Sequence, residues 1–509
     1  MKVESGRQSR GEVTLEADVV VVGTGAGGSV VLRECARAGL SVIGLEEGGH
    51  HTWRDFSQRE EQMFPKLFQE GGGRLTQDRA IRVLQGRGVG GSTVHNTNLC
   101  KRTPDPILDL WAEKYGVSGA RPRDLAKSFE AIERDLSVAP IPEAAVNANN
   151  DLLRRGAAAL GWRAGVLMHN RVGCQQSGFC ELGCAYDAKQ NALKVLLPDA
   201  ESHGARLYSD VRVTEITTRD GRATGVRGEA RGDDGETLAH YTIRARVVVL
   251  AASAVGSAEL VLASGLPDPH RQAGKRLRMH PGAVVAGLFE HDVAGHKGIP
   301  QSVECTEHLS FEEGSPKRTW IIPAFAHPIG TATTLPGFGK AHMAAMRRYR
   351  KLAVLTAMLH DETAGEVAPR SEGSSPKIQY RMIEADRAAL ARGLVACARL
   401  LFAAGATEVT IPAVPPVRVT SARELDALDT SFVRPHGVPL SAVHPMGTLR
   451  LGDDPRVSVV SSQGEHHQVG GLFVADGSLF PTSLGGPPQI SIYAFALHLS
   501  PHIVAAARR

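Results

Sequence analysis

The sequence lacks features that mark several classes of protein. Its 509 residues, with a net charge of +4, contain no run of about eighteen apolar residues and no block of about five like charges. The first absence argues against a transmembrane helix, and the second leaves no electrostatic footprint for nucleic acid. Residues 1–17 are polar and contain no apolar core of a secretory signal, so we expect a cytoplasmic protein.

Cysteines and aromatic residues are also scarce. Seven cysteines are too few for a disulfide scaffold in a chain of this length. Aromatic residues make up only 5% of the chain, which argues against a sugar site built from stacking rings. Apolar residues, by contrast, make up 42%, so the chain can bury a large core.

A βαβ unit stands near the N-terminus. Residues 18–22 (DVVVV) read as a buried parallel strand, residues 29–39 as a helix that stops at a glycine, and residues 41–45 as a second strand. Gly23, Gly25 and Gly28 form GxGxxG between the first strand and the helix. This spacing allows a tight turn, close approach of a pyrophosphate and close helix packing. Glu46, after the second strand, is placed to accept hydrogen bonds from ribose hydroxyls, and the unit predicts dinucleotide binding.

The nucleotide-binding sheet is interrupted along the chain. Hairpin signals in residues 211–242 precede an apolar strand at 247–252, and a third strand-and-turn at 471–476 precedes an apolar helix at 490–506. We therefore predict a discontinuous nucleotide domain of residues 1–105, 196–285 and 431–509. Residues 106–195 and 286–430, with helices at 124–135 and 384–404, are expected to form a second, α+β domain that shapes the substrate site.

The stretch Gly86–Asn96 (GRGVGGSTVHN) resembles the flavin-covering motif GRxxGGSSxxN of the glucose–methanol–choline (GMC) oxidoreductases. Residues 247–266, 441–452 (SAVHPMGTLRLG) and 471–481 (GLFVADGSLFP) resemble further signatures of that family, in the family's order. The resemblance implies a Rossmann-like α/β FAD-binding domain, FAD as cofactor, and oxidation of an alcohol by hydride transfer to flavin N5. It assigns FAD contacts to Gly23, Gly25, Ala26, Gly28, Glu46, Arg87, Gly90, Gly91, Ser92, His95, Asn96, Val213, Ala252, Asp476, Gly477, Pro488 and Gln489.

His444, in the HxxGT pattern, matches the histidine that in this family acts on the substrate hydroxyl proton. A histidine of near-neutral pKa suits that role. The family usually places a second His or Asn about forty residues later, where this chain has Pro487, which has no side-chain donor or acceptor. Either another group assists His444, with His436, His466, His467 or a group of the substrate as candidates, or the reaction differs and is a desaturation, an isomerisation or a lyase reaction.

The resemblance leaves two further questions about cofactors. The first is the flavin linkage, because some family members carry a covalent bond from flavin to a histidine in GGxxxHN, the spacing that includes His95. The second is the C-x5-C-x3-C loop formed by Cys174, Cys180 and Cys184, which resembles loops of bacterial relatives. Three thiolates can ligate a three-iron cluster, or a zinc ion with an outside ligand. The alternatives are packed reduced cysteines, or one disulfide with a spare thiol.

The substrate is expected to be a small molecule. The low aromatic content favours a medium or large apolar alcohol, such as a sterol, a terpenoid or a long-chain molecule. Electrons would pass from the flavin to oxygen or to an external acceptor. The sequence does not indicate the oligomeric state.

Overall fold

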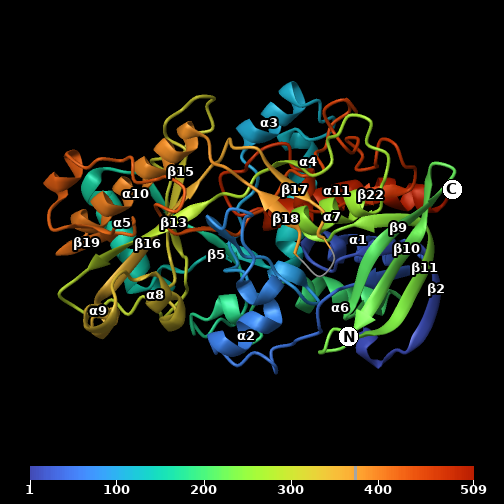
Figure 1. Cartoon of the computed structure of the whole chain (residues 1–509), viewed down its shortest axis with the longest axis horizontal. Coiled ribbons are helices and arrows are strands. Elements are labelled where there is room, and N and C mark those ends of the chain that lie inside the picture. The colour runs from blue at the N-terminus through green and yellow to red at the C-terminus, as the bar shows by residue number, and fades with distance from the viewer. Residues whose placement is uncertain (372–374) are drawn as a thin grey trace.

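The computed structural model describes residues 1–371 and 375–509, which form two lobes, each built on a β-sheet (Figure 1). The first sheet has the strand order β1-β8-β3-β2-β11-β10-β9, and β22 pairs with β11. Its strands are β1 (Glu4–Ser5), β2 (Gly11–Val22), β3 (Val42–Leu45), β8 (Arg206–Ser209), β9 (Val211–Arg219), β10 (Arg222–Arg231), β11 (Thr237–Leu250) and β22 (Leu472–Val474).

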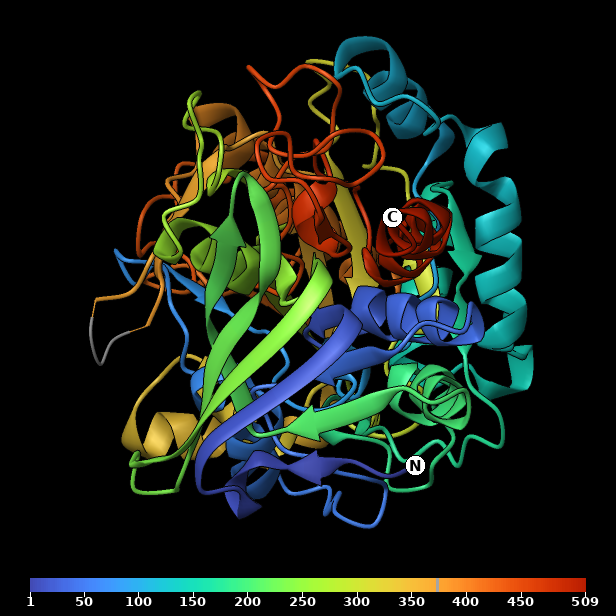
Figure 2. The same ribbon diagram turned by 90° about the vertical axis from the view of Figure 1, so that its right-hand side faces the viewer.

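The pairing of β2 with β11 forms the centre of the first sheet. The two strands are parallel, and residues 19–22 pair with residues 247–250. These two valine-rich runs are almost completely buried, as expected for parallel strands covered on both faces. Figure 2 shows the two strands side by side along the sheet. The predicted resumption of the sheet after some two hundred residues is thus confirmed, as are the βαβ unit and the hairpin at 211–242.

Helices cover this sheet. The helix α1 (Ala26–Arg37) follows β2 and packs against α6 (Leu197–Ser202) and α11 (Gln489–Ala507), while α4 (Pro122–Asp135) packs on the outer side of α11. The helix α7 (Ser253–Ala263) follows β11 and packs against β9. Within the described residues, α11 is the one helix long and apolar enough to cross a membrane, and 56% of its apolar stretch is buried in the fold.

The second sheet has the order β20-β19-β13-β16-β15-β14-β6, with β21 bridging β13 and β4. Its strands are β4 (Ile81–Val83), β6 (Ala164–Val166), β13 (Gly282–Leu288), β14 (Val303–Cys305), β15 (Thr319–Pro323), β16 (Leu352–Leu359), β19 (Glu408–Ile411), β20 (Val417–Val419) and β21 (Leu440–Ala442). One face is covered by α10 (Glu384–Ala403) and α5 (Ala148–Leu160). The two helices can approach closely because Gly156 has no side chain. A Cβ at this position would lie 2.3 Å from the Leu400 carbonyl oxygen.

Smaller elements complete the chain. Three short strands, β12 (Lys275–Leu277), β17 (Gly365–Ala368) and β18 (Lys377–Gln379), form one small sheet. A second small sheet consists of β5 (Val138–Pro140) and β7 (Met168–Asn170). The remaining helices are α2 (Glu60–Leu67), α3 (Asp105–Lys114), α8 (Pro328–Thr334) and α9 (Gly339–Arg347).

The structure divides the chain at different residues from those predicted. The predicted boundary at 285/286 falls inside β13, a central strand of the second sheet. Within the segment 106–195, α5 packs on the second sheet, but α4 packs against α11 in the first lobe. Strand content alone did not indicate these boundaries, because β4 and β21 of the second sheet lie in segments that otherwise belong to the first lobe.

Candidate active site

A cavity of about 920 Å³ is lined by residues from both lobes. Its wall includes His444 and most of the residues that the sequence predicts as cofactor contacts: Gly23, Gly25, Ala26, Glu46, Gly91, Ser92, His95, Asn96, Val213, Ala252, Asp476, Gly477, Pro488 and Gln489. Gly28, Arg87 and Gly90 lie outside the lining. Arg87 instead donates a hydrogen bond to the Glu47 carbonyl oxygen (3.2 Å).

Gly23 and Gly28 have the tight-turn and close-packing roles that their spacing predicts. Gly23 has a φ of +98°, which favours glycine. A Cβ on Gly28 would lie 1.9 Å from the Gly23 carbonyl oxygen, and one on Gly27 would lie 1.5 Å from the Ala475 carbonyl oxygen. The N-terminus of α1, at Gly25, has no side-chain cap and borders the cavity. Its unpaired N–H groups and helix dipole therefore form a site for an anionic diphosphate.

Glu46 lies at the end of β3 and links two glycine loops. Its Oε2 accepts hydrogen bonds from the Thr24 amide (3.2 Å) and hydroxyl (3.0 Å), and its Oε1 accepts from the amides of Gly48 and Gly88 (3.1 Å each). Burial and the neighbouring Glu47 raise the pKa of Glu46 to about 7. The carboxylate therefore fixes the turn after β2 to the flavin-covering motif, in addition to facing the cavity.

Two predicted contacts that are 393 positions apart in sequence meet at the start of α11. The Asn96 Nδ2 donates to Gln489 Oε1 (2.6 Å), and the Gln489 Nε2 donates to the Leu99 carbonyl oxygen (2.7 Å). Lys189 also fixes this loop. Its buried Nζ donates to the carbonyl oxygens of Val94 (2.8 Å) and Asn96 (2.6 Å). The flavin-covering motif is thereby fixed to the C-terminal helix.

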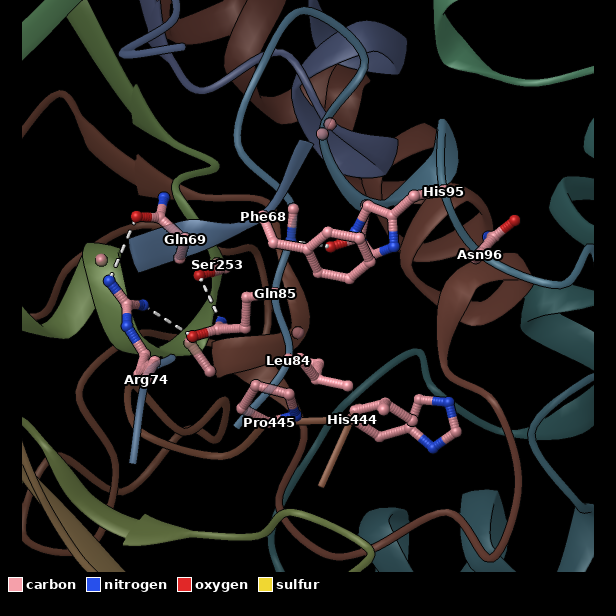
Figure 3. A pocket seen from close by; sticks show the side chains of 18 of the residues that line it. Phe68, Gln69, Arg74, Leu84, Gln85, His95, Asn96, Ser253, His444 and Pro445 are labelled. Atoms are coloured by element: carbon pink, nitrogen blue, oxygen red, sulfur yellow. Dashed lines mark hydrogen bonds between the residues drawn. The ribbon is translucent and has the colours of Figure 1, made fainter. Parts of the chain in front are cut away.

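Sequence reasoning missed a polar cluster in the cavity wall (Figure 3). Arg74 donates to Gln85 Oε1 (2.8 Å) and to Gln69 Oε1 (3.2 Å), and the Gln85 Nε2 donates to the Ser253 hydroxyl (3.0 Å). The four side chains come from three separate segments of the chain. No short motif contains them, so the fold was needed to identify them.

His444 forms a pair with a second histidine that the sequence analysis did not identify. The Nδ1 atoms of His444 and His280 lie 3.2 Å apart, and the two rings are nearly perpendicular. The backbone explains the pairing, because Gly282 pairs with Ser441 and Arg278 with Met446 in antiparallel fashion. Burial lowers the pKa of His280 to about 3 and holds the pKa of His444 well below its usual value. Both rings are therefore neutral near pH 7.

The hydrogen bonds of His280 fix the tautomers of both rings. The amides of Leu484 (3.1 Å) and Gly485 (3.2 Å) both donate to His280 Nε2, so the proton of neutral His280 is on Nδ1. His280 Nδ1–H then donates to His444 Nδ1. The proton of His444 is consequently on Nε2, which makes its free nitrogen a hydrogen-bond donor. This differs from the proton acceptor that the sequence analysis expected.

The predicted partners of His444 lie elsewhere. His436, His466 and His467 are not in the cavity wall, whereas Pro487 is. His436 is exposed, and His467 Nε2 contacts the Gly452 carbonyl oxygen (3.0 Å) and the Ser458 hydroxyl (2.9 Å). Only the antiparallel alignment of distant segments identifies His280 as the partner, and the sequence carries no local signal for it.

His95 lies in the cavity wall beside Phe68, with ring centroids 4.0 Å apart. Its Nε2 is buried and has no hydrogen-bond partner in the described chain. This nitrogen can therefore either contact the edge of a bound flavin ring or form a covalent bond to it. Acid precipitation distinguishes these alternatives, since covalently bound flavin stays with the protein pellet.

The cysteine loop lies next to the flavin-covering motif. All seven cysteines are free thiols, and no group of three His, Cys, Asp or Glu side chains in the described residues could hold a metal ion. The structure therefore gives the predicted metal site at Cys174, Cys180 and Cys184 no support. Cys174 Sγ instead accepts from the Gln176 amide (3.4 Å) and Cys184 Sγ from the Ala188 amide (3.3 Å). Lys189 Nζ donates to the Cys180 carbonyl oxygen (3.1 Å), which links this loop to the motif at 86–96.

Comparison with known proteins agrees with this geometry. Family models described as GMC oxidoreductase match residues 64–282 and 362–496. The chain belongs to the GMC oxidoreductase family. FAD is the cofactor of this family, and the glycine turn, the free N-terminus of α1 and the Asn96–Gln489 contact fit that dinucleotide.

The relatives of this GMC oxidoreductase include uncharacterized and named enzymes. An uncharacterized GMC-type oxidoreductase of Mycobacterium tuberculosis is 38% identical, covering 96% of this chain and 76% of the relative. A long-chain-alcohol oxidase of Arabidopsis thaliana is 27% identical, covering 100% of this chain and 69% of the relative. The crystal structure of pyridoxine 4-oxidase from Mesorbium loti has a TM-score of 0.72 at 17% identity, covering 95% of this chain and 98% of that chain. The last similarity shows the shared fold.

The His280–His444 pair leads to a first prediction. His280→Ala should retain FAD but reduce substrate-dependent flavin reduction by about 10- to 100-fold, because His444 loses the group that orients it. His280→Asn should recover part of the rate, since Asn tolerates the φ of +51° and offers an N–H group near the position of Nδ1. Stopped-flow absorbance at about 450 nm measures the rate.

His436→Ala is the matched control, because it removes an exposed histidine outside the cavity. It should leave the rate unchanged. Equal rates for wild type, His280→Ala and His436→Ala would exclude a positioning role for His280.

The buried histidines lead to a second prediction, about pH. Burial lowers the pKa of His95 and His280 to about 3 and that of His466 to about 4. An unfolded histidine titrates near 6.5, so between pH 6.5 and about 4 the unfolded chain binds protons that the folded chain does not. The free energy of unfolding should therefore fall on acidification, by up to about 1.4 kcal/mol per pH unit for each such histidine.

Thermal unfolding between pH 7.5 and 5 measures this effect. His466→Asn should make the dependence on pH less steep, whereas His436→Asn, at an exposed position, should not. A pH dependence that is identical in all three proteins would contradict the prediction.

Proposed function

We propose that this GMC oxidoreductase oxidises a medium or large apolar alcohol, with His444 donating a hydrogen bond to the substrate oxygen. The apolar wall beside His444 is the observation that carries this proposal. Trp320 and Ile322 of β15 pair with Met358 and Thr356 of β16, so the four side chains share the sheet face that lines the cavity. Val284 of β13 extends this face.

The chemistry of an alcohol explains the position of His444. A carbinol carbon releases hydride more readily when its oxygen is losing its proton. FAD, when bound, supplies the hydride acceptor. Because His444 Nδ1 is occupied by His280, Nε2 is the atom left for the substrate oxygen. With its proton on Nε2, His444 donates a hydrogen bond to that oxygen and stabilises the negative charge that remains there once the hydroxyl proton has passed to solvent.

Accepting the hydroxyl proton would require both tautomers to change. His444 Nδ1–H would have to donate to His280 Nδ1, and His280 would then carry its proton on Nε2. That proton would face the amides of Leu484 and Gly485, which donate to the same atom. The backbone therefore opposes a simple general-base role for His444.

This opposition, together with Pro487, favours a second candidate function. His444 Nε2–H is a neutral hydrogen-bond donor, and Pro487 places no polar side chain near it. Such a donor suits a substrate oxygen that gains negative charge, as in an enolate. Desaturation, isomerisation or lyase chemistry next to a carbonyl group would use such a donor. The apolar face of β15 and β16 would accommodate a carbonyl compound as well as an alcohol.

A third prediction tests the choice between these functions. Anaerobic addition of apolar primary and secondary alcohols, including sterols, terpenoids and long-chain alcohols, should bleach the flavin band near 450 nm. Bleaching by none of them, with product formed from a carbonyl substrate, would favour the second function. Readmission of oxygen or of an artificial dye to the reduced protein would then distinguish an oxidase from a dehydrogenase.

His444→Ala tests the residue within the same assay. The variant should keep the bound-flavin spectrum and reduce flavin more slowly by about 10²-fold or more, the scale expected for loss of a positioned hydrogen-bond donor to a developing oxyanion. His467→Ala is the control, because its ring lies outside the cavity wall. An unimpaired His444→Ala protein would remove this histidine from the mechanism.

A further inference from the structure

One surface segment combines exposed apolar side chains with unpaired positive charge. It comprises α8, α9 and the turn that follows, residues 328–351, at the lower edge of the second lobe (Figure 1). Phe338 is 95% exposed, Met343 58% and Ile329 47%. None of the residues of α9 is fully buried, and six of its nine residues are exposed.

The charge of the segment has one sign. Residues 335–351 (LPGFGKAHMAAMRRYRK) contain Lys340, Arg347, Arg348, Arg350 and Lys351 and no acidic residue. Arg350 pairs with Asp292 (2.9 Å), whereas Lys340, Arg347 and Arg348 are exposed and form no ion pair in the described part of the chain. Three free cations thus accompany the exposed apolar side chains.

The segment is fixed to the protein beside the cavity. The amides of Ile329 and Gly330, at the start of α8, donate to the two carboxylate oxygens of the buried Glu60 (2.8 and 2.9 Å). Glu60 begins α2, and Phe64 of the same helix lines the cavity. Thr334, the last residue of α8, also lines the cavity. A ligand of this surface would therefore lie next to the substrate site.

We propose that residues 328–351 dock the enzyme on the surface of a bilayer that contains anionic lipids. Exposed Phe, Met and Ile side chains next to Lys and Arg are the combination that binds at the boundary between headgroups and acyl chains. Phe338 and Met343, which are 95% and 58% exposed, can insert among acyl chains while the three cations face anionic headgroups. Docking through this segment would place the cavity close to the membrane. An apolar alcohol could then pass from the membrane into the cavity, an inference that rests on the proposed function.

Vesicle binding by the FAD-loaded full chain tests the proposal without any turnover. The protein should sediment with vesicles of equal parts phosphatidylglycerol and phosphatidylcholine at low salt, and not with pure phosphatidylcholine. A Lys or Arg near an anionic surface contributes about fivefold in binding. The triple variant Lys340→Gln, Arg347→Gln and Arg348→Gln should therefore bind at least about tenfold more weakly.

The control variant removes the same charge from the first lobe, with Arg10→Gln, Arg219→Gln and Arg227→Gln at exposed positions. It should bind like wild type, and unchanged flavin spectra would show that both triple variants are folded. Equal binding of the two triple variants would overturn the proposal, because total charge would then explain any attraction.

Insertion of the apolar side chains needs a separate measurement. Phe338→Trp should emit at shorter wavelength when phosphatidylglycerol vesicles are added, and lipids brominated on the acyl chain should quench it. Phe338→Asp should weaken binding. An unshifted, unquenched Trp would overturn the proposal, as would a dimer of wild type in sedimentation velocity that Phe338→Asp dissociates.

Discussion

The antiparallel alignment of residues 278–282 with residues 441–446 is the contact on which the catalytic end of this molecule depends. It joins the start of β13, in the second sheet, to the segment that returns to the first lobe as β22. His280 and His444 face each other because of this register, and a shift of one residue would separate them. At the other end of the cavity, the missing side chain of Gly27 lets α1 touch Ala475, so the same C-terminal segment also closes the nucleotide end.

The sequence was sufficient where the determining interactions are local. The apolar strands at 18–22 and 247–252, the glycine turn at 23–28 and the helices predicted at 124–135, 384–404 and 490–506 all follow from periodicity and from glycine geometry. The flavin-covering motif was recognisable because its glycines and short polar residues are contiguous. Most of the predicted cofactor residues consequently line one cavity.

The remaining features depend on contacts between distant segments. His280 and the cluster of Arg74, Gln85 and Ser253 come from separate segments of the chain, and no pattern in the sequence brings them together. The domain boundaries were misplaced for a related reason, since β4 and β21 are strands of three residues that belong to the second sheet only through their partners. The structure gives the C-x5-C-x3-C spacing no support as a metal site, since Cys174 and Cys184 accept hydrogen bonds from backbone amides of their own loop.

The helices α11 and α9 relate to the rest of the fold in opposite ways. The helix α11 is apolar on every side, and it packs between α1 and α4, which is how a core helix is recognised. The helix α9 has fewer apolar residues, but none of them is buried, and the cations beside them lack partners. Hydropathy alone ranks α11 as the membrane candidate, whereas burial assigns it to the core. An apolar side chain indicates a membrane contact only where the fold leaves it uncovered, and by that criterion the exposed Phe338 is the stronger signal.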